Sequence, residues 1–416
     1  MKVFEELGLS KEILEAIMKL GFNEPTKIQK ESIPLILQGK DVIGESATGS
    51  GKTLAFGCGM IEKAIPGKGI QALVLTPTRE LCEQVCKDLR TFSIHKKLRI
   101  TPVYGGVSID RQFDELRRAE IVVATPGRLL DHLGRGTIDL SKVKVFVLDE
   151  ADAMLEMGFI EDVEQIIEAC PKERQTMCFS ATMYWEIKQL ADKYMKQPVD
   201  ISATKMVDPT KLKQIYYDVA RNMKLSLLVH LLQEQKDGMA MIFCNSRRTT
   251  DFVVQNLKTN HIKSTAIHGG MSQNKRLRTI DLFNKGKAGA LICTDVAARG
   301  LHIDNVSHVF NYDIPKDAKD YVHRIGRTAR AGEEGTAVNL LCDYDYDNFN
   351  RVLDTYNEYV IDSVQAPYLK RAVMIRVEES PRSRFGGNGR SNGYGNRSHG
   401  NGSYSGGHSN SQRRWN

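Results

Sequence analysis

The chain has 416 residues, of which 41% are hydrophobic and 26% are charged, a globular composition that excludes a collagen-like chain and a chain disordered throughout. The net charge is +7, no run approaches the roughly 18 apolar residues of a transmembrane helix, and residues 1–6 lack the apolar stretch of a signal peptide. These features exclude a membrane bundle and favour two or three soluble domains in the cytoplasm.

The first predicted elements are a strand, a glycine-containing loop and a helix. Residues 42–44 are apolar, residues 46–53 read Ser-Ala-Thr-Gly-Ser-Gly-Lys-Thr, and residues 54–56 are apolar again. In such a loop the backbone approaches an anion closely, and the amides at the helix N-terminus point at it. Lys52 would reach the β- and γ-phosphates of a nucleotide, and Thr53 would ligate Mg²⁺. The alternative is a chance glycine-rich turn.

Three short apolar runs follow, at residues 72–75, 121–124 and 143–148, with a helical pattern at residues 160–169. Continuous apolar runs of this length are typical of strands that are buried on both faces. Strands that alternate with helices form right-handed βαβ units. The first half of the chain is therefore predicted to contain a parallel sheet.

A pair of cysteines lies on one predicted helix of this half. Cys82 and Cys86 are four residues apart, so they would share a helix face. They would supply at most half of a zinc site, and the chain contains no Cys-x-x-Cys partner pair. We favour core thiols over a metal site.

The third apolar run leads into Asp149-Glu150-Ala151-Asp152. A carboxylate at the carboxyl end of a buried parallel strand is placed to hold the Mg²⁺ of a nucleotide, which is the role predicted for Asp149. Glu150 would position or activate a water molecule. An acidic loop is the alternative, but its occurrence after a phosphate loop favours hydrolysis of a nucleoside triphosphate.

Strand–helix alternation stops at residues 201–210 and resumes with apolar runs at residues 239–243, 288–292 and 307–310. We interpret the chain as two α/β domains and a tail. The predicted boundaries are residues 1–203 for the first domain, 204–210 for a linker, 211–365 for the second domain, 366–379 for an extension and 380–416 for the tail.

The tail carries most of the net charge. It contains six arginines and no acidic residue, which leaves about +1 (7 − 6) for the rest of the chain. Its Gly, Ser and Asn content predicts disorder. Arginine attracts phosphate and aromatic rings stack on bases, so we favour RNA binding over a solubilising tether. The interleaved aromatic residues are Phe385, Tyr394, Tyr404 and Trp415.

Taken together, these motifs resemble the DEAD-box RNA helicases of superfamily 2, a family named after the sequence found at residues 149–152. The resemblance extends over about residues 3–365. It implies two tandem RecA-like domains, an RNA-dependent ATPase that uses ATP and Mg²⁺, and local unwinding of short RNA duplexes or remodelling of RNA–protein complexes.

The resemblance also implies roles for individual residues. An adenine-recognition motif matches residues 21–29, with Gln29 as its amide and Phe4 as its upstream aromatic residue. The residues implied for nucleotide binding are Phe4, Glu24, Gln29, Ser46, Ala47, Thr48, Gly49, Ser50, Gly51, Lys52, Thr53 and His302. Lys52, Asp149, Glu150, Arg327 and Arg330 are implied for catalysis, the two arginines as fingers that act across the cleft. Asp152, Ser180 and Thr182 are implied for coupling.

Several matched segments contact RNA in this family, through its backbone. The residues implied for RNA binding here are Thr78, Arg79, Gly106, Thr125, Arg128, His268, Gly269, Arg276 and Thr294. Because the two arginine fingers and the phosphate loop come from different domains, RNA that spans both domains would favour closure and hydrolysis.

Three residues depart from the family pattern. Ser46 opens the phosphate loop, His302 replaces an Asp that contacts ribose, and Ala329 replaces a Gly. If residue 329 requires a positive φ, Ala costs about 1 kcal/mol there, and if it is helical, Ala is neutral or better. The segments 297–303 and 309–313 look most like helicases of bacterial mRNA-decay complexes, so RNA-decay or RNP proteins are predicted partners.

Two other functions remain open at this point. One is an RNA clamp or scaffold that uses ATP only to lock onto RNA, and the other is a DNA helicase. The complete arginine-finger segment argues against the first, and the family resemblance argues against the second.

Overall fold

The computed structural model describes residues 2–46, 49–203, 211–235, 238–301, 303, 306–329 and 334–375. The chain divides into two units, Met1–Val377 and Glu378–Asn416. The predicted linker, residues 204–210, and the predicted tail, residues 380–416, lie outside the described residues. In the described ranges, no helix has the length and apolar character needed to span a membrane.

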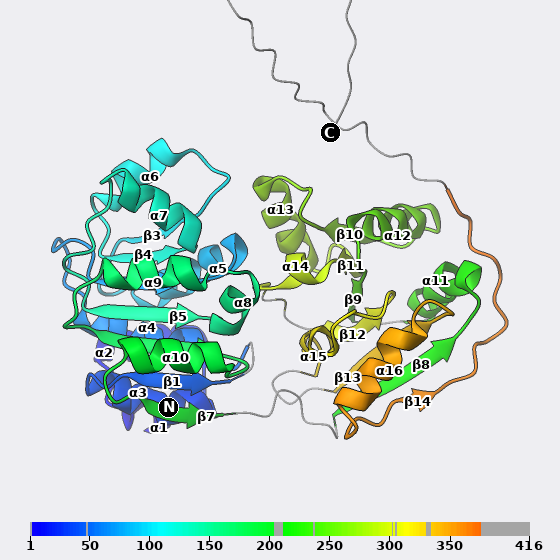
Figure 1. The fold of residues 1–416 in the computed structure, drawn as a ribbon, viewed down its shortest axis with the longest axis horizontal. Helices are drawn as coiled ribbons and strands as arrows, with labels where there is room; N and C mark the ends of the chain where they lie inside the picture. Colours follow the sequence, from blue (N-terminus) through cyan, green and yellow to red (C-terminus); the bar gives the residue numbers. More distant parts are fainter. Residues whose placement is uncertain are drawn as a thin grey trace, which may run out of the picture. The chain divides into compact units, whose positions relative to one another are not determined.

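The first unit contains two seven-stranded sheets, and the first sheet has the order β3-β4-β2-β5-β6-β1-β7 (Figure 1). Every pair of neighbours in it is parallel. Its strands are β1 (Val42–Glu45), β2 (Ala72–Leu75), β3 (Ile100–Val103), β4 (Ile121–Ala124), β5 (Val145–Asp149), β6 (Gln175–Ser180) and β7 (Val199–Ser202).

Helices cover both faces of the first sheet. Successive strand residues enter opposite core clusters: Val74 packs with α2–α5 on one face, and Leu73 packs with α7, α9 and α10 on the other. Burial on both faces explains why the inner strands β2, β4 and β5 are almost continuously apolar. The helices are α1 (Lys2–Glu5), α2 (Lys11–Lys19), α3 (Lys27–Leu37), α4 (Lys52–Lys63), α5 (Arg79–Phe92), α6 (Ile109–Leu116), α7 (Pro126–Gly134), α8 (Ala151–Glu156), α9 (Ile160–Glu168) and α10 (Trp185–Tyr194).

The second sheet has the order β10-β11-β9-β12-β13-β8-β14 and is also parallel throughout. Its strands are β8 (Leu212–Asp218), β9 (Met239–Phe243), β10 (Ser264–Ile267), β11 (Ala290–Cys293), β12 (Val306–Asn311), β13 (Gly335–Leu341) and β14 (Asp362–Ser363). The helices are η1 (Arg221–Met223), α11 (Lys224–Glu234), α12 (Arg247–Thr259), α13 (Gln273–Asn284), α14 (Asp295–Ala298), α15 (Ala318–Ile325) and α16 (Tyr346–Thr355).

The two sheets repeat one topology. Reading the two orders side by side, β8 takes the place of β1, β9 that of β2, β12 that of β5 and β13 that of β6. In a parallel sheet all carboxyl ends lie at one edge, where α/β proteins bind their ligands. The predicted parallel α/β fold is therefore confirmed. The exact domain boundaries stay a prediction.

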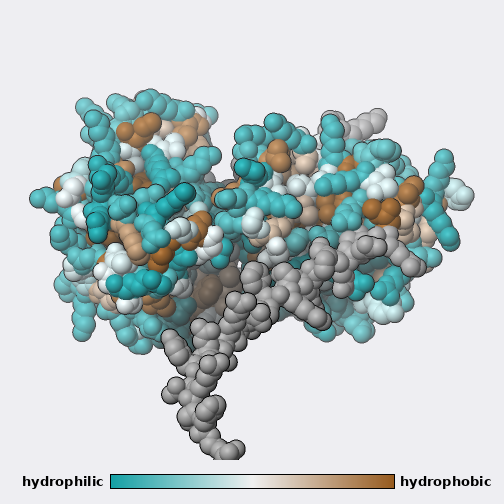
Figure 2. Space-filling model, turned by 90° about the horizontal axis from the view of Figure 1, so that it is seen from above, coloured by the Kyte–Doolittle hydropathy of each residue, from teal (hydrophilic) through white to brown (hydrophobic). Residues whose placement is uncertain are grey.

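The predicted strands agree with the observed ones to within two residues. The run at residues 143–148 forms β5 two residues later than predicted and includes Asp149, and the run at residues 288–292 forms β11 from Ala290 to Cys293. All eight cysteines are buried and unpaired, and Cys82 donates its thiol to the Val123 carbonyl, which agrees with core thiols. Figure 2 shows a mainly hydrophilic face on which hydrophobic residues are scattered.

Candidate nucleotide and RNA site

The phosphate loop connects β1 to the first residue of α4. Ser46 is fully buried, its N–H donates to the Ser180 carbonyl at 2.9 Å, and its hydroxyl accepts from the Ser50 hydroxyl at 3.0 Å. The buried Lys52 ammonium donates to the Ser46 carbonyl at 3.1 Å. Gly51 has a φ of 90°, a conformation that glycine adopts without strain. Helix-terminal amides and a buried ammonium group therefore meet at one loop, which suits a phosphate.

Gln29 lies at this loop and is buried. Its side-chain oxygen accepts from the Thr26 N–H at 2.9 Å and so caps α3. Its side-chain nitrogen donates to the Gly51 carbonyl at 3.0 Å. One amide thus joins the adenine-recognition motif to the phosphate loop. The second hydrogen of the same nitrogen is available to another acceptor.

The acidic motif begins at the end of β5 and continues into α8. Asp149 is buried, and Glu150 has φ 55° and ψ 54°, in the left-handed region that a non-glycine residue rarely adopts. Burial raises the pKa of Glu150, while Lys52 and Arg327 lower it. A strained, buried carboxylate beside two cations is typical of functional sites.

Asp152 and the Ser-Ala-Thr motif form one hydrogen-bonded group. One oxygen of Asp152 accepts from the N–H groups of Ala181 and Thr182 at 3.1 and 2.9 Å and from the Thr182 hydroxyl at 3.0 Å. The Asp152 N–H donates to the Ser180 hydroxyl at 3.2 Å. The structure therefore brings together the three residues implied for coupling.

Arg327 reaches this group from the second sheet. It is buried in the turn after α15, and its guanidinium donates to the Leu301 carbonyl at 2.6 Å. Burial lowers the pKa of Arg327, and the Glu150 carboxylate opposes this shift. Arg327, Glu150 and Asp152 line one small cavity of about 50 Å³. The first implied finger thus lies beside the acidic motif, whereas Arg330, Ala47, Thr48 and His302 lie outside the described residues.

Ala329 has a φ of 54°, so the condition for an energetic cost at this position is met. The turn is tight, because a Cβ added at Gly335 would lie 2.5 Å from the Ala329 nitrogen. Ala329 is therefore strained in this turn.

The residues implied for RNA binding on the first sheet follow strand ends. Thr78 caps α5 by accepting from the Leu81 N–H at 3.3 Å. The Arg79 guanidinium lies so close to Gly106 that a Cβ there would be 2.1 Å from it, and Gly106 has a φ of 83°. Thr125 caps α7. These residues share the carboxyl edge of the sheet.

Arg128 is held in place by a buried network. Its guanidinium donates to the Val107 carbonyl and to the Gln112 side-chain oxygen, each at 3.2 Å. The same oxygen lies 3.0 Å from His132 Nε2. Burial and the neighbouring Arg128 lower the pKa of His132. Gln112 and His132 were not singled out in the sequence, which contains no motif that marks them.

On the second sheet, His268 lies 3.1 Å from the Asp251 carboxylate, and Gly269 lies against Arg247. Thr294 caps α14. Arg276 forms an ion pair with Glu80 at 2.8 Å.

Glu80 also accepts from Gln273 at 2.8 Å. Gln273 and Arg276 are three residues apart on α13 and so lie on one face of the helix. This spacing could have identified Gln273 as a residue that shares the environment of Arg276.

Two residues implied for nucleotide binding do not lie at the phosphate loop or the acidic motif. Phe4 is fully buried in the core cluster of the first sheet, and Glu24 is exposed. The structure gives Phe4 a packing role, and a contact of either residue with the nucleotide stays a prediction.

Comparison with known protein families matches two models to the chain. The DEAD/DEAH box helicase model matches residues 26–190, and the helicase conserved C-terminal domain model matches residues 223–332. Together they span the strands β1–β6 and β9–β12, with the phosphate loop and the acidic motif in the first model.

Curated relatives share this assignment. The DEAD-box ATP-dependent RNA helicase CshA of Geobacillus kaustophilus is 46% identical over 345 residues, which is 82% of this chain and 74% of the relative. The protein of the same name from Bacillus cereus is 42% identical over 376 residues, covering 90% of this chain and 71% of the relative.

Solved structures are similar as well. Saccharomyces cerevisiae Dbp5 bound to RNA and ADP BeF3 matches with a TM-score of 0.79 and 31% identity, over 87% of this chain and 95% of that one. A DEAD box protein from Methanococcus jannaschii matches with a TM-score of 0.54 and 41% identity, over 87% and 98%. The family models, the identities and the shared fold agree, and the chain belongs to the DEAD-box family of ATP-dependent RNA helicases.

Proposed function

We propose that this chain hydrolyses ATP at the loop between β1 and α4 and uses the resulting domain closure to open short RNA duplexes. The observation that supports this most directly is the meeting of Lys52, Glu150 and Arg327, because they are a phosphate-loop cation, an acidic-motif carboxylate and a finger from the second sheet. Lys52 and the α4 amides bind the phosphates, and Gln29 selects adenine.

The residues present fit Mg²⁺. The Thr53 hydroxyl and the Asp149 carboxylate are oxygen ligands of the kind Mg²⁺ prefers, and both lie at the carboxyl edge of the first sheet. Among the described residues, no group of three or more His, Cys, Asp or Glu is arranged to hold a metal ion, so phosphate oxygens would complete the shell. When bound, Mg²⁺ neutralises charge that develops on the phosphates.

Glu150 orients the attacking water, and Arg327 with Arg330 stabilises the transition-state charge. A finger of this kind is worth about 10³–10⁵ in rate, or roughly 4–7 kcal/mol. Because Arg327 follows a helix of the second sheet, hydrolysis requires the second sheet to lie close enough for Arg327 to reach the phosphates bound at the first. RNA contacts on both sheets would favour that arrangement, so RNA should stimulate the ATPase.

Further proposals follow from the family and the tail. The arginines and aromatic residues of residues 380–416 add RNA affinity beyond the two sheets. The partners include RNA-decay or RNP proteins. The cytoplasmic location stays a prediction.

The experiment that tests the proposal compares steady-state ATPase activity without nucleic acid, with single-stranded RNA and with matched DNA. We expect stimulation by RNA and not by DNA, because the 2′-hydroxyl distinguishes them. Glu150→Gln should bind ATP normally and lose turnover. Normal turnover in that variant would refute the role of Glu150. Single-turnover unwinding of a short duplex then distinguishes a helicase from an ATP-gated clamp.

A further inference from the structure

The second sheet has a large cavity at the position where the first sheet has its phosphate loop. β8 takes the place of β1 in the strand order, and α11 begins at Lys224 as α4 begins at Lys52. The cavity has a volume of about 1360 Å³ and is lined by residues that follow β8, β9, β12 and β13. It therefore lies at the ligand-binding edge of the second sheet.

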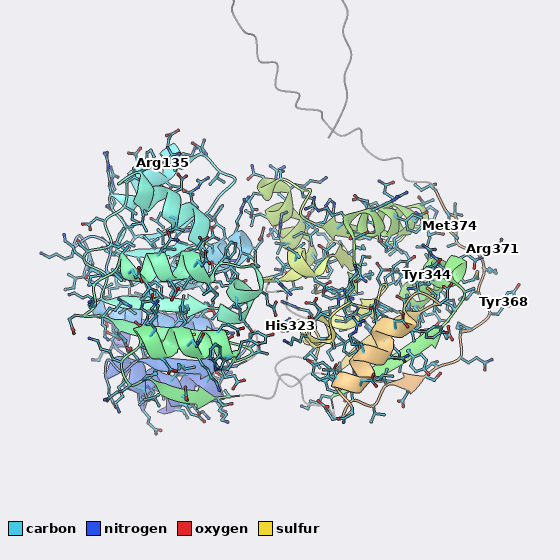
Figure 3. All side chains as sticks on the ribbon, viewed as in Figure 1. Arg135, His323, Tyr344, Tyr368, Arg371 and Met374 are labelled. Carbon is cyan, nitrogen blue, oxygen red and sulfur yellow. The ribbon has the colours of Figure 1, made fainter. Side chains whose placement is uncertain are left out.

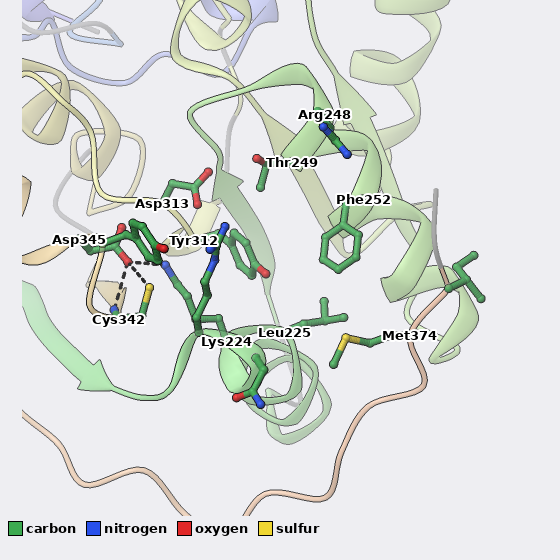
Figure 4. A pocket seen from close by; sticks show the side chains of 14 residues that line it. Lys224, Leu225, Arg248, Thr249, Phe252, Tyr312, Asp313, Cys342, Asp345 and Met374 are labelled. Carbon is green, nitrogen blue, oxygen red and sulfur yellow. Dashed lines mark hydrogen bonds and ion pairs between the residues drawn. The ribbon is translucent and has the colours of Figure 1, made fainter. Parts of the chain in front are cut away.

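The cavity cannot cradle a triphosphate as the first sheet does. The segment between β8 and α11 reads Val-Ala-Arg-Asn-Met and has no glycine for close backbone approach. The buried Lys224 ammonium is paired with Asp345 at 2.7 Å and lies over the Tyr312 ring at 5.3 Å. Figure 4 shows this pair on one side of the cavity. The lysine stabilises the wall of the cavity, and the ligand must be held by other groups.

Those groups are aromatic rings and arginines. Phe252 points into the cavity in Figure 4, with Arg248 and Thr249 beside it at the start of α12. Tyr344 is 68% exposed, and the Arg221 guanidinium lies over its ring at 4.4 Å. In single-strand binding proteins, bases stack on aromatic side chains, and arginine adds cation–π contacts.

The two acidic residues that line the cavity are compatible with binding of a phosphate group. Burial raises the pKa of Asp313, and its carboxylate accepts from the Asn245 N–H at 2.9 Å, so its charge is partly compensated. Asp345 is paired with Lys224. Arg221 and Arg248 are both exposed and line the cavity.

The cavity is also adjacent to the predicted RNA face. Arg247 lies against Gly269, one of the residues implied for RNA binding, and the next residue, Arg248, lines the cavity. The first turn of α12 therefore contacts both surfaces. A strand that leaves the predicted RNA face has the cavity next to it.

We propose that this cavity binds one nucleotide, with its base stacked at Tyr344 and Phe252 and its phosphate at Arg221 and Arg248, and that the nucleotide belongs to an RNA strand extending from the predicted RNA face. The inference rests on the proposed placement of RNA along the second sheet. A free mononucleotide has the same chemistry, and the test below separates the two sources.

The test uses the full chain with the double variant Arg221→Gln, Tyr344→Ala. Both residues are exposed and neither belongs to the ATPase site, so folding and basal activity should be unchanged. The matched control is Arg371→Gln, Tyr368→Ala. Tyr368 is 93% exposed, and both control residues lie on the same side of the second sheet as Tyr344 and outside the cavity (Figure 3).

Affinity is measured by fluorescence anisotropy with a non-hydrolysable ATP analogue and labelled oligouridines of two lengths, one that fits the core face and one that extends well beyond it. We expect the double variant to bind the long probe roughly 10-fold more weakly, as for the loss of one stacked base. The short probe and the control variant should show no change.

The outcomes separate the possible ligands. Labelled AMP serves as a third probe. If the double variant loses binding of AMP but still binds the long oligouridine normally, the site takes a free mononucleotide and the RNA assignment is overturned. If both the long probe and AMP bind unchanged while RNA still stimulates the ATPase, the nucleotide site is refuted and a protein partner becomes the alternative. If RNA does not stimulate the wild-type chain, the proposed function itself fails.

Discussion

At the scale of single residues, two backbone positions carry strain beside the proposed catalytic groups. Glu150 and Ala329 both have positive φ values, 55° and 54°. Left-handed geometry costs a non-glycine residue about 1–2 kcal/mol. Glu150 is held there between β5 and α8, and Ala329 lies in the turn between α15 and β13. The first strain positions a carboxylate, and the second has no functional group to position.

Replacing Ala329 by Gly should therefore stabilise the protein. Gly relieves the left-handed strain, and this gain outweighs the extra conformational entropy that Gly gives the unfolded chain. We expect the free energy of unfolding to rise by about 0.5–1 kcal/mol in urea denaturation. The control is Ala169→Gly, at a position with a φ of −75°, where Gly should cost stability. A loss in both variants would show that the turn at Ala329 relaxes without strain.

The buried Glu150 predicts a pH-dependent stability difference. Because burial raises its pKa in the folded state, the folded protein binds the proton more tightly than the unfolded chain. The contribution of Glu150 to stability is thus present below its unfolded pKa and is lost as the pH rises through the folded value. Glu150→Gln should be more stable than the wild type at pH 8 and gain less at pH 4, measured by urea denaturation without nucleotide. A gain independent of pH would contradict the raised pKa.

At the scale of elements, α3 is fixed at both ends by buried amides. Gln29 caps its first turn and reaches Gly51 of the phosphate loop. Gln175 of β6 donates to the carbonyls of Ile36 and Lys40 at the other end, at 3.0 and 2.6 Å. The helix thus holds the phosphate loop through one amide and the sheet through the other.

These two amides separate stability from nucleotide binding. Gln29→Ala and Gln175→Ala each remove a buried side chain that is hydrogen-bonded at one end of α3, and each should cost about 1–3 kcal/mol of unfolding free energy. Only Gln29→Ala should also raise the KM for ATP, because only Gln29 contacts the phosphate loop. Steady-state ATPase with saturating RNA and urea denaturation measure the two effects. An equal KM change in both variants would mean that α3 acts only through stability.

At the scale of the whole Met1–Val377 unit, residues beside the first sheet contact residues beside the second. Two of them, Thr78 and Arg276, are implied for RNA binding. Glu80 of α5 holds Arg276 and Gln273 of α13, and a Cβ at Gly300 would lie 2.1 Å from the Thr78 hydroxyl. Arg276 is implied as a phosphate contact, so Glu80 and RNA would compete for it.

Glu80→Gln should therefore increase RNA affinity in the absence of nucleotide severalfold, because a neutral amide holds Arg276 less tightly. The control is Glu83→Gln on the same helix, where the carboxylate accepts from the Tyr104 hydroxyl. Fluorescence anisotropy with labelled RNA measures both. If affinity falls in Glu80→Gln alone, Glu80 positions Arg276 for RNA and does not compete with it.

The sequence by itself determined the fold class and the local chemistry of the site. Apolar runs buried on both faces predict parallel strands, and the phosphate loop and acidic motif are contiguous in the chain, so their residue types and spacing carry the prediction. The tertiary structure alone decided which distant residues meet. The Glu80–Arg276 pair, the burial of Phe4, the positive φ of Ala329 and the cavity beside Lys224 depend on how elements far apart in the chain pack. The apolar pattern of a segment predicts that one of its faces is buried, but it does not show which distant residues that face contacts.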